Sequence, residues 1–472
     1  MPSNLDQDSP NPPTSSPPDT PTPDTPDTPD TPDTPDDEGI LDQLTPEPNP
    51  LLYPTTPAEV NLQTTLGVSL TQALELATRN NRDLEQALLS LEQARAALRE
   101  QQAALYPTLS TSARASYTNP LEDSSNETSA LNGELSASYT VFDFGRRHYS
   151  IRIARDRLRR AELEVNRINQ SIRLDVAEQY YNLQNATEQV RINGAAVETS
   201  RQNLQDTRAK EEAGIGTRFD TLQAEAQLAD DRVNLIQAQN DQQVARRQLA
   251  QILDIPQTTN IDATDPIRVS GNWTQSLDET ILAAFANRVE LEQQLLDLQI
   301  ARDQARLANA NLLPQFDLSA SYDLQQDLIN RSTVIGIDTT DDIQQEVSLV
   351  LSMQWTLFDG GAARAQASQY RLEQAIAASE FANQRNQIRF EVENAYLTLE
   401  SQRRKIDAAT TGVESSQEGL RLARLRFQAG VGTQLEVLNA QSTLTEAESN
   451  LSRAITDYNL ALNSLMRAIN GL

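Results

Sequence analysis

Apolar residues recur every seven positions along two long segments of the chain. The second segment lies between Gly361 and Gly430, holds 68 residues without proline, and carries Val392, Leu399, Ile406, Val413, Leu420 and Phe427 at this spacing. Its counterpart between Gly145 and Gly214 carries Val176, Leu183, Val190, Val197 and Leu204. A strict seven-residue period indicates helices that supercoil left-handedly. At 1.5 Å per residue each helix would be about 100 Å long, which no compact domain contains.

Shorter segments before these helices alternate apolar and polar residues at every second position. They predict two β-hairpins, over residues 108–142 and 315–358. Strands of about ten residues with one apolar and one polar face are typical of a transmembrane β-barrel with a wet interior, although a soluble β-sandwich edge alternates in the same way. Tyr117 and Tyr322 are expected near the loop ends of outgoing strands, and Tyr139 and Trp355 near the far ends of returning strands, which gives two aromatic membrane belts.

The two halves of the chain share one plan. An offset of 216 residues pairs Phe142 with Phe358 and Gly214 with Gly430, while an offset of 207 pairs Pro107 with Pro314. The first repeat covers 61–254 with a helix, a hairpin, a long helix (146–213) and a returning helix (218–254). A linker spans 255–275, and the second repeat covers 276–472 with a helix, a hairpin, a long helix (362–429) and a returning helix (433–469). Capping boxes at Ser69 with Gln72 and at Ser276 with Glu279 start helical runs that continue to the prolines.

Four strands cannot close a barrel, because about eight is the smallest number that surrounds a filled interior. The sequence therefore predicts an oligomer whose copies pool their strands. Each long helix buries only a narrow stripe, which favours a single-layer wall of helices and agrees with a hydrophobic content of only 38%. The first helix of each repeat can stack end to end with the returning helix and complete this wall.

The N-terminal segment has a different composition. Residues 1–60 hold 17 of the 22 prolines and 13 acidic residues, and no basic residue precedes Arg79. Such a sequence predicts a disordered acidic, Pro-rich tail, either an extended spacer or an end without a task.

The formal charge of −28 argues against a nucleic-acid partner, and the absence of cysteine excludes disulfides and thiolate metal sites.

Other sequence signals are weak. No apolar run reaches the roughly 18 residues of a transmembrane helix, and a secretory signal peptide is expected to be absent from the chain as given. The single histidine, His148, has no nucleophile or ligand spacing around it, so neither a catalytic site nor a metal site is expected. Asn126 matches a glycosylation sequon, but a bacterial surface loop is the favoured setting.

A Gly-x-Gly-Thr turn ends each long helix. Gly214 and Gly430 can end the helices in the left-handed conformation, and Thr217 with Asp220 or Thr433 with Glu436 can start the next ones. The turns "GIGTRFDTLQAE" and "GVGTQLEVLNAQ", the junctions "FDFG" and "FDGG", and the segments "ALYPTLS" and "LLPQFDLS" resemble TolC-type outer-membrane efflux proteins, the outer membrane factors, from about residue 65 to the end.

This resemblance implies a mainly α fold with a membrane β-barrel portion. Three copies would form a homotrimer with a 12-stranded β-barrel, four strands per chain, in the outer membrane of a Gram-negative-type cell, continued by an α-helical coiled-coil barrel through the periplasm. Small molecules, proteins or both would be exported, in efflux or type I secretion, with an inner-membrane pump (RND, ABC or similar) and a periplasmic adaptor (membrane fusion) protein. No cofactor is implied.

The resemblance also implies functional residues at the tip of the tunnel. The adaptor-binding candidates are Gly214, Ile215, Gly216, Thr217, Gly430, Val431, Gly432 and Thr433, and the constriction candidates are Asp220, Glu436 and the neutral Asn439. Asp220 and Glu436 are equally expected as helix caps. Gly432 and Phe427 occupy positions where some relatives carry an arginine and a tyrosine that close the tip, which leaves the closing mechanism open. The alternative function is a soluble or surface coiled-coil scaffold or adhesin, which would not need amphipathic hairpins.

Overall fold

The computed structural model describes residues 44, 53–57, 60–61, 64–118, 127–256, 258–332, 336–338 and 343–471. Most of the predicted tail and the sequon at Asn126 lie outside these residues. Leu44 is an exception within the predicted tail, since its side chain is fully buried and its carbonyl accepts a 2.9 Å hydrogen bond from Asn80 Nδ2. The chain is therefore held in place at Leu44, within the segment expected to be a free spacer.

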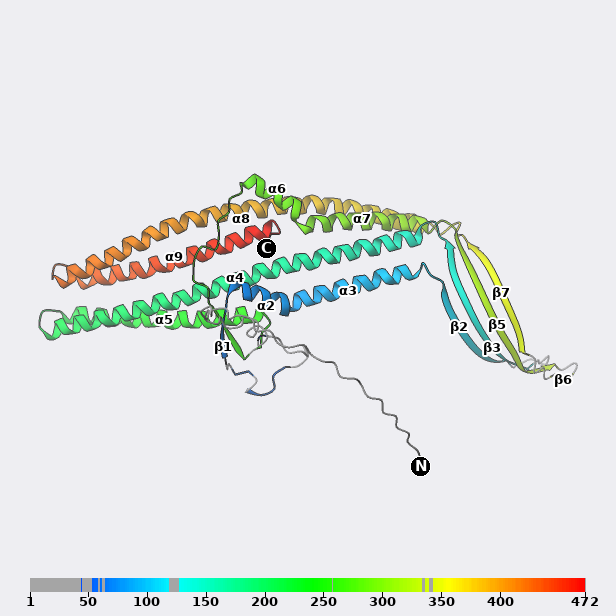
Figure 1. Cartoon of the computed structure of the whole chain (residues 1–472), viewed down its shortest axis with the longest axis horizontal. Coiled ribbons are helices and arrows are strands. Elements are labelled where there is room, and N and C mark those ends of the chain that lie inside the picture. Colours follow the sequence, from blue (N-terminus) through cyan, green and yellow to red (C-terminus); the bar gives the residue numbers. More distant parts are fainter. Residues whose placement is uncertain are drawn as a thin grey trace, which may run out of the picture. The chain divides into compact units, whose positions relative to one another are not determined.

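Helices make up most of the described chain (Figure 1). Those of the first half are α2 (Leu70–Asn80), α3 (Arg82–Ala103), α4 (Arg146–Glu212) and α5 (Arg218–Ile252), and those of the second half are α6 (Leu277–Asn287), α7 (Val289–Ala310), α8 (Ala362–Gln428) and α9 (Gln434–Ala468). Two of them, α4 and α8, have 67 residues each. The prediction of a mainly helical fold with a β-hairpin in each half is confirmed.

The helix expected before each hairpin is broken in two. Asn81 has an extended backbone (φ −64°, ψ 126°) between α2 and α3, and Arg288 has one (φ −67°, ψ 114°) between α6 and α7. The Asn81 side chain accepts hydrogen bonds from the backbone N–H groups of Asp83 and Leu84, so it starts α3 as an N-cap. The prediction of one continuous helix was wrong, because a capping side chain can restart a helix without proline or glycine.

These breaks let the shorter helices abut the returning helices end to end. Asn81 Nδ2 donates to the carbonyl of Ile252 at the end of α5 (3.2 Å), and Arg288 Nη1 donates to the carbonyl of Ala468 at the end of α9 (3.3 Å). Both bonds satisfy carbonyl groups that a helix end leaves without an intrahelical partner. The stacking expected from helix lengths is thus built from specific hydrogen bonds.

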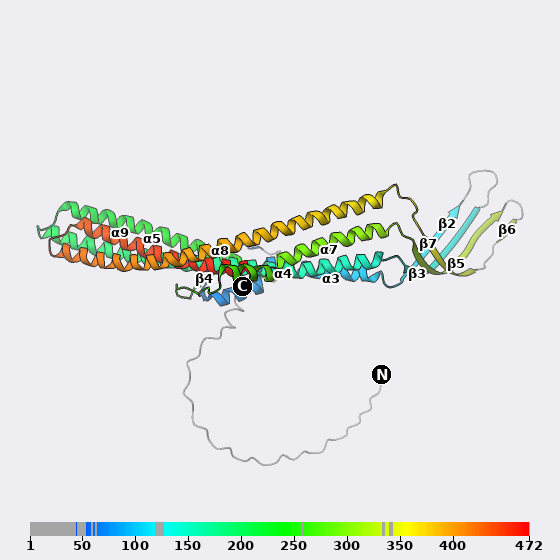
Figure 2. The ribbon, with the colours of Figure 1, turned by 90° about the horizontal axis from the view of Figure 1, so that it is seen from above.

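Most helices form a layer that is one helix thick. Figure 1 shows α4 and α8 running through the whole helical part, paired with α5 and α9 in one half and with α3 and α7 in the other, and Figure 2 shows the same ribbon turned by 90°. Packing of α4 against α7 and α9 joins the two repeats. One buried cluster joins residues of α6, α7, α8 and α9, and it includes Ile388, Val392, Tyr458 and Leu465. Among the described residues, no helix is long and apolar enough to cross a membrane.

One sheet contains β2 (Thr108–Thr118), β3 (Glu127–Phe142), β5 (Gln315–Ser332), β6 (Gly336–Asp338) and β7 (Ile343–Gln354). Its antiparallel strands follow the order β2, β3, β5, β7, with β6 paired to the outer end of β5. The register places Thr111, Leu135, Tyr322 and Val347 side by side. The next row towards the loops contains Ser112, Glu134, Asp323 and Glu346. The four long strands therefore share one mostly apolar face and one polar face.

Strand lengths differ from the expected ten residues. With 16 and 18 residues, β3 and β5 are much longer, whereas the hairpin predicted to reach residue 358 ends at Gln354. Gln354 pairs with Gln315, the first residue of β5, and Pro314 before it has no N–H group to continue the ladder. The extension of the strand through Trp355 and Leu357 was therefore wrong.

A second, small sheet was not predicted at all. Within the predicted linker, β4 (Thr259–Ala263) pairs in parallel with β1 (Thr64–Val68), from the start of the first repeat. Five-residue strands brought together across 195 positions leave too little local periodicity to be recognised. This sheet packs on α4 and α5.

Candidate functional site: the paired tip turns

The turn after α4 depends on two glycines. Gly214 has φ +75°, and the backbone N–H groups of Ile215 and Gly216 both donate to the carbonyl of Lys210, at 3.0 and 2.9 Å. A Cβ atom on Gly216 would lie only 2.9 Å from Lys210 Cβ and 3.0 Å from the backbone nitrogen of Glu211. Position 214 therefore needs glycine for its conformation, and position 216 needs glycine for space.

The turn after α8 has the same geometry. Gly430 has φ +75°, and the N–H groups of Val431 and Gly432 donate to the carbonyl of Arg426, each at 3.0 Å. A Cβ atom on Gly432 would lie 2.9 Å from Arg426 Cβ. The repeated Gly-x-Gly-Thr sequence thus encodes the same reversal of direction twice.

The helix caps involve two of the three constriction candidates. Thr217 Oγ1 accepts a hydrogen bond from the backbone N–H of Asp220 (3.2 Å), and the backbone N–H of Thr217 donates to the Asp220 carboxylate (3.4 Å), which closes a capping box. Thr433 Oγ1 accepts one from the N–H of Glu436 (3.2 Å), while the Glu436 carboxylate lies 3.5 Å from Arg426 Nε across the turn. Asn439 is exposed one turn further along α9. Within the described chain, no hydrogen bond or ion pair joins Asp220, Glu436 and Asn439 to one another.

Apolar side chains project from both tips. Ile215 is 79% exposed, Val431 is 71% exposed, and Phe219, in the first turn of α5, is 66% exposed. Exposed apolar groups gathered at one end of a molecule are typical of a surface that binds another protein. The sequence analysis did not identify Phe219 as a tip residue, because an apolar residue in a helical segment can equally lie in the buried seam between two helices.

A direct contact between the two tips was also missed. Lys210 Nζ, from α4, donates to the carbonyl of Phe427, from α8 (3.2 Å), and lies 3.4 Å from the centre of the Phe427 ring. A cation over an aromatic ring is attracted by the negative face of the ring. This contact joins the first repeat to the second immediately behind the turns. In the sequence, the only sign of this contact is a lysine near the end of a helix with a heptad pattern.

The helices on either side of the first turn are joined by an ion pair. Arg208 on α4 donates to Glu225 on α5. This hydrogen bond is the largest cause of a pKa of Glu225 below its ordinary value of 4.5. The pair therefore favours the charged carboxylate and links α4 to α5 beside the turn.

Behind the tips, a buried polar network connects α4, α5 and α9. Ser200 on α4 donates to Asp231 on α5 and accepts a 2.7 Å hydrogen bond from Gln441 on α9. Asn203 Nδ2 donates to Gln441 Oε1 (2.8 Å). Polar groups buried at a helix seam fix the alignment of the helices, because a shifted alignment would leave them without partners. Polar residues at heptad seam positions are the sequence signal for this network.

The four aromatic belt candidates lie at different levels of the sheet. Tyr117 is exposed near the loop end of β2, whereas Tyr322 pairs with Val347, ten residues before the end of β5. Tyr139 faces the helices, with the Arg147 guanidinium 5.6 Å from its ring centre, and Trp355 Nε1 donates to the carbonyl of Leu312 (3.0 Å). Tyr322 is not near the loop end as expected, because β5 extends further than the apolar pattern indicated.

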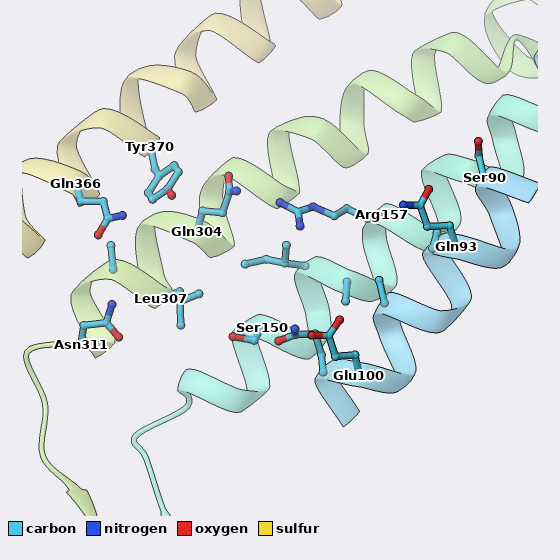
Figure 3. A pocket seen from close by; sticks show the side chains of 16 residues that line it. Ser90, Gln93, Glu100, Ser150, Arg157, Gln304, Leu307, Asn311, Gln366 and Tyr370 are labelled. Carbon is cyan, nitrogen blue, oxygen red and sulfur yellow. The ribbon is translucent and has the colours of Figure 1, made fainter. Parts of the chain in front are cut away.

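Figure 3 shows a groove of about 550 Å³ lined by four helices. Its lining mixes neutral polar side chains, including Ser90 and Gln93 from α3, Ser150 from α4 and Gln304 from α7, with alanine, isoleucine and leucine side chains, and Arg157 and Glu100 supply opposite charges. A single groove can be lined by all four helices of one layer only where that layer is concave. The structure therefore has a concave face of mixed polarity beside the strands.

The single histidine, His148, contacts an aromatic neighbour. The His148 ring packs edge-on against Tyr149, with ring centres 5.6 Å apart, in the first turn of α4. In the described part of the chain, no group of three or more histidine, cysteine, aspartate or glutamate side chains could hold a metal ion.

Comparison with known proteins gives one consistent result. The family model "Outer membrane efflux protein" matches residues 73–254 and 280–471. The outer membrane protein TolC of Escherichia coli is 23% identical over 403 residues, covering 84% of this chain and 80% of TolC. The alkaline protease secretion protein AprF of Pseudomonas aeruginosa is 25% identical over 296 residues, covering 61% of this chain and 59% of AprF.

The fold agrees with a solved channel structure. CusC, whose crystal structures concern folding and transmembrane channel formation, superimposes with a TM-score of 0.74 at 20% identity, over 89% of this chain and 96% of that one. These findings support the predicted export channel over the scaffold or adhesin alternative. The two family matches also confirm the tandem duplication, since each covers one repeat. With both repeats matched, the chain belongs to the outer membrane efflux protein family.

Proposed function

We propose that three copies of this chain form one export channel through the outer membrane, with the helices projecting into the periplasm. The observation that carries the proposal is the four-stranded sheet, in which one face is apolar and exposed and the other is polar. Its outer strands, β2 and β7, each have one edge without a partner in the described chain. Unpaired strand edges and an exposed apolar face are both unfavourable in water. Closing the sheets of several copies into a barrel pairs the edges, and placing the barrel in lipid covers the apolar face.

The number of copies follows from the size of the pore. Two copies would give eight strands, and an eight-stranded barrel is filled by its own side chains. Three copies give twelve strands and leave room for a passage. The concave groove of Figure 3 would then form part of the inner wall of the helical tunnel.

The test uses purified full-length protein. It should require detergent, have the mass of three chains by light scattering after subtraction of detergent, and conduct ions across a planar lipid bilayer. A detergent-free monomer, or a trimer without conductance, would contradict the proposal.

For the tip turns we propose docking of a periplasmic adaptor protein. Gly214, Ile215, Gly216 and Thr217, with Gly430, Val431, Gly432 and Thr433, present a rigid backbone and exposed apolar side chains at one end of the helices. An adaptor of this kind would connect the channel to an energised inner-membrane pump, and small molecules, proteins or both would be exported. Asp220, Glu436 and Asn439 would surround the narrowest part of the pore.

The docking proposal is tested by substituting the glycines. Alanines at both Gly430 and Gly432 should abolish co-purification of an adaptor, because one position has a positive φ and the other has no room for Cβ. The matched control replaces Gly412 and Gly419 in α8, where an added Cβ would meet no atom within 4 Å. Equal loss of adaptor in both variants would contradict docking at the turn.

A further inference from the structure

The duplication extends to the register of the strands. In the second repeat Tyr322 of β5 pairs with Val347 of β7. The offset of 207 residues converts Tyr322 into Ala115, and the offset of 216 converts Val347 into Leu131. Ala115 of β2 and Leu131 of β3 are indeed a pair in the first repeat. Both offsets therefore hold residue by residue, so a strand pairing seen at one place predicts the residue pairs at the equivalent place.

The central pair of strands has no equivalent within one chain. β3 of the first repeat pairs with β5 of the second, and Leu135 lies opposite Tyr322. Under the same two offsets β3 becomes β7 and β5 becomes β2, the two outer strands of the sheet. Within one chain β3 and β5 lie between these outer strands, so the equivalent pairing needs a second copy.

The offsets also give the register of this pairing between copies. The pair of Leu135 with Tyr322 becomes Leu351 of one copy opposite Ala115 of the next, and one residue along Ser352 lies opposite Arg114. The first of these pairs belongs to the apolar face of the sheet and the second to the polar face. The faces of the two copies therefore agree, whereas a shift by one residue would put apolar side chains on the polar face.

The helices next to the sheet have the same relation. Inside one chain α4 follows β3 and α7 precedes β5, and these two helices pack together. Their equivalents are α8, which follows β7, and α3, which precedes β2. No comparable packing joins α3 to α8 within the described chain. Pairing of β7 with β2 of a second copy would bring these helices together.

Exposed apolar side chains lie where this helix contact would form. Leu296 of α7 is buried in a cluster with Leu163 of α4, but Leu89, its counterpart on α3, is 62% exposed. On α8, Ile376 is 57% exposed and Leu372, one turn earlier, is 64% exposed. The contact inside the chain covers Leu296, and an equivalent contact with a second copy would cover Leu89.

Charge distinguishes the contact inside the chain from the contact between copies. Arg152 of α4 pairs with the buried Asp303 of α7 (3.0 Å). In the described chain, three arginines of α4 form ion pairs with α7, and all have uncharged counterparts in α8: Ser368, Ala375 and Ile376. Two of their three acidic partners have uncharged counterparts in α3, which are Ala96 and Ser90. The charges therefore favour α7 as the partner of α4 and leave α3 to pack on α8.

We propose that neighbouring copies join by pairing β7 of one with β2 of the next, with Leu351 opposite Ala115. In the same contact, Leu372 and Ile376 of α8 pack on the side of α3 that carries Leu89. The partner is a second copy of this chain. The proposal rests on the proposed closure of one barrel by several copies, to which it adds the register and the contact residues.

The test uses disulfides, because the chain has no cysteine of its own. Ala115→Cys and Leu351→Cys are introduced together into the full-length protein, which is purified in detergent and oxidised. Residues opposite each other in antiparallel strands have Cα atoms about 4.5–5.5 Å apart, within the range of a disulfide. Denaturing gels should then show two and three linked chains, and dithiothreitol should return them to single chains.

Two controls accompany this variant. Ala115→Cys with Val347→Cys keeps the same face of the sheet but lies four residues out of register, about 13 Å, and should leave single chains. Leu135→Cys with Tyr322→Cys is the equivalent pair inside one chain. It should lose its free thiols on oxidation and still migrate as a single chain.

The helix contact is tested by Leu89→Lys, which should cause loss of trimer in light scattering, since it buries a charge between copies. The matched control is Leu88→Lys. The counterpart of Leu88 is Leu295, which stays 45% exposed inside the chain, so the control should keep the trimer. Circular dichroism verifies the folding of both variants.

The outcomes separate this proposal from the channel proposal. A trimer in light scattering that gives no linked chains with Leu351→Cys, or gives them equally with Val347→Cys, would overturn the register and leave the channel standing. Equal trimer loss in the two lysine variants would overturn the helix contact. Absence of a trimer before any substitution would contradict both proposals.

Discussion

Lys210 is one of only two lysines in the chain, and it lies where the two tips meet. Its position over the Phe427 ring makes it a candidate for holding the proposed pore closed. An exposed cation–π contact contributes about 0.5–1 kcal/mol. A contact of that size would bias a closed tip without locking it, as the proposed docking of an adaptor at the tip would require.

Replacement of Lys210 by methionine should therefore increase the open fraction of single channels in a planar bilayer by about two- to fivefold. Methionine keeps the length of the side chain and removes the charge. Lys405→Met is the control, because it removes the other lysine, which is exposed on α8. An unchanged open fraction for Lys210→Met would show that this contact does not hold the tip.

The Arg208–Glu225 pair makes the first hairpin sensitive to acid. The folded pKa of Glu225 lies below the unfolded value, so the contribution of the pair to the stability of the folded hairpin is fully present above the unfolded pKa and is lost as the pH falls through the folded pKa. After correction for the intrinsic pH dependence of amide exchange, protection at the ends of α4 and α5 should therefore fall in wild type as the pH is lowered through the folded pKa. In Glu225→Gln, protection should already be lower at pH 7 and should depend less on pH. Identical profiles for the two proteins would contradict this role.

At the scale of elements, the junction between sheet and helices differs between the repeats. Arg146, at the start of α4, donates to the carbonyls of Ala310, Asn311 and Leu313 and to Gln315 Oε1. It binds the end of α7 and the start of β5 at one point. The corresponding position in the second repeat is Ala362. Arg146 therefore connects the helices to the sheet in the first repeat, and the second repeat has no arginine at the corresponding position.

Arg146→Ala should reduce the free energy of unfolding by about 2 kcal/mol, because hydrogen bonds from a charged donor are worth more than neutral ones. Denaturant unfolding of the detergent-solubilised protein measures this change. Arg99→Ala on α3, which removes an exposed arginine with no ion pair in the described chain, should change stability by less than about 0.5 kcal/mol. Similar losses in both variants would remove Arg146 from its proposed role.

The elements also show where local patterns were sufficient. The heptads, the alternating strands and the Gly-x-Gly-Thr turns each specify a structure through neighbours within a few residues, and the structure contains each of them, with strand lengths that differ from those predicted. The break at Asn81 and the β1–β4 pair were missed. Asn81 acts through hydrogen bonds to two backbone groups, and β1 pairs with a strand 195 positions further along the chain.

At the scale of the whole molecule, the apolar face of the sheet has nothing to cover it in a single chain. Leu109, Leu349 and Leu351 are more than 60% exposed. Contact with lipid tails would remove this surface from water, as the proposed barrel requires. The adjacent positions on the strands would then line the pore.

Leu349→Arg should reduce the amount of assembled trimer recovered from outer membranes, because a charge at the middle of the lipid-facing surface costs about 2–4 kcal/mol per chain. Ser348→Arg is a matched control, since Ser348 is the neighbouring residue and lies on the polar face. It should assemble normally and alter ion selectivity. Equal loss of trimer in both variants would contradict the assignment of the two faces.

The sequence by itself determined the duplication, the long paired helices, the amphipathic hairpins and the two turns, because each of these is encoded in periodicity or in residues with special backbone properties. Only the tertiary structure decided which side chains meet across the repeats. The contact of Lys210 with Phe427 and the Ser200–Asp231–Gln441 network join residues that are far apart in the chain. Such contacts depend on how helices rotate and align when they pack, and no local pattern records that alignment.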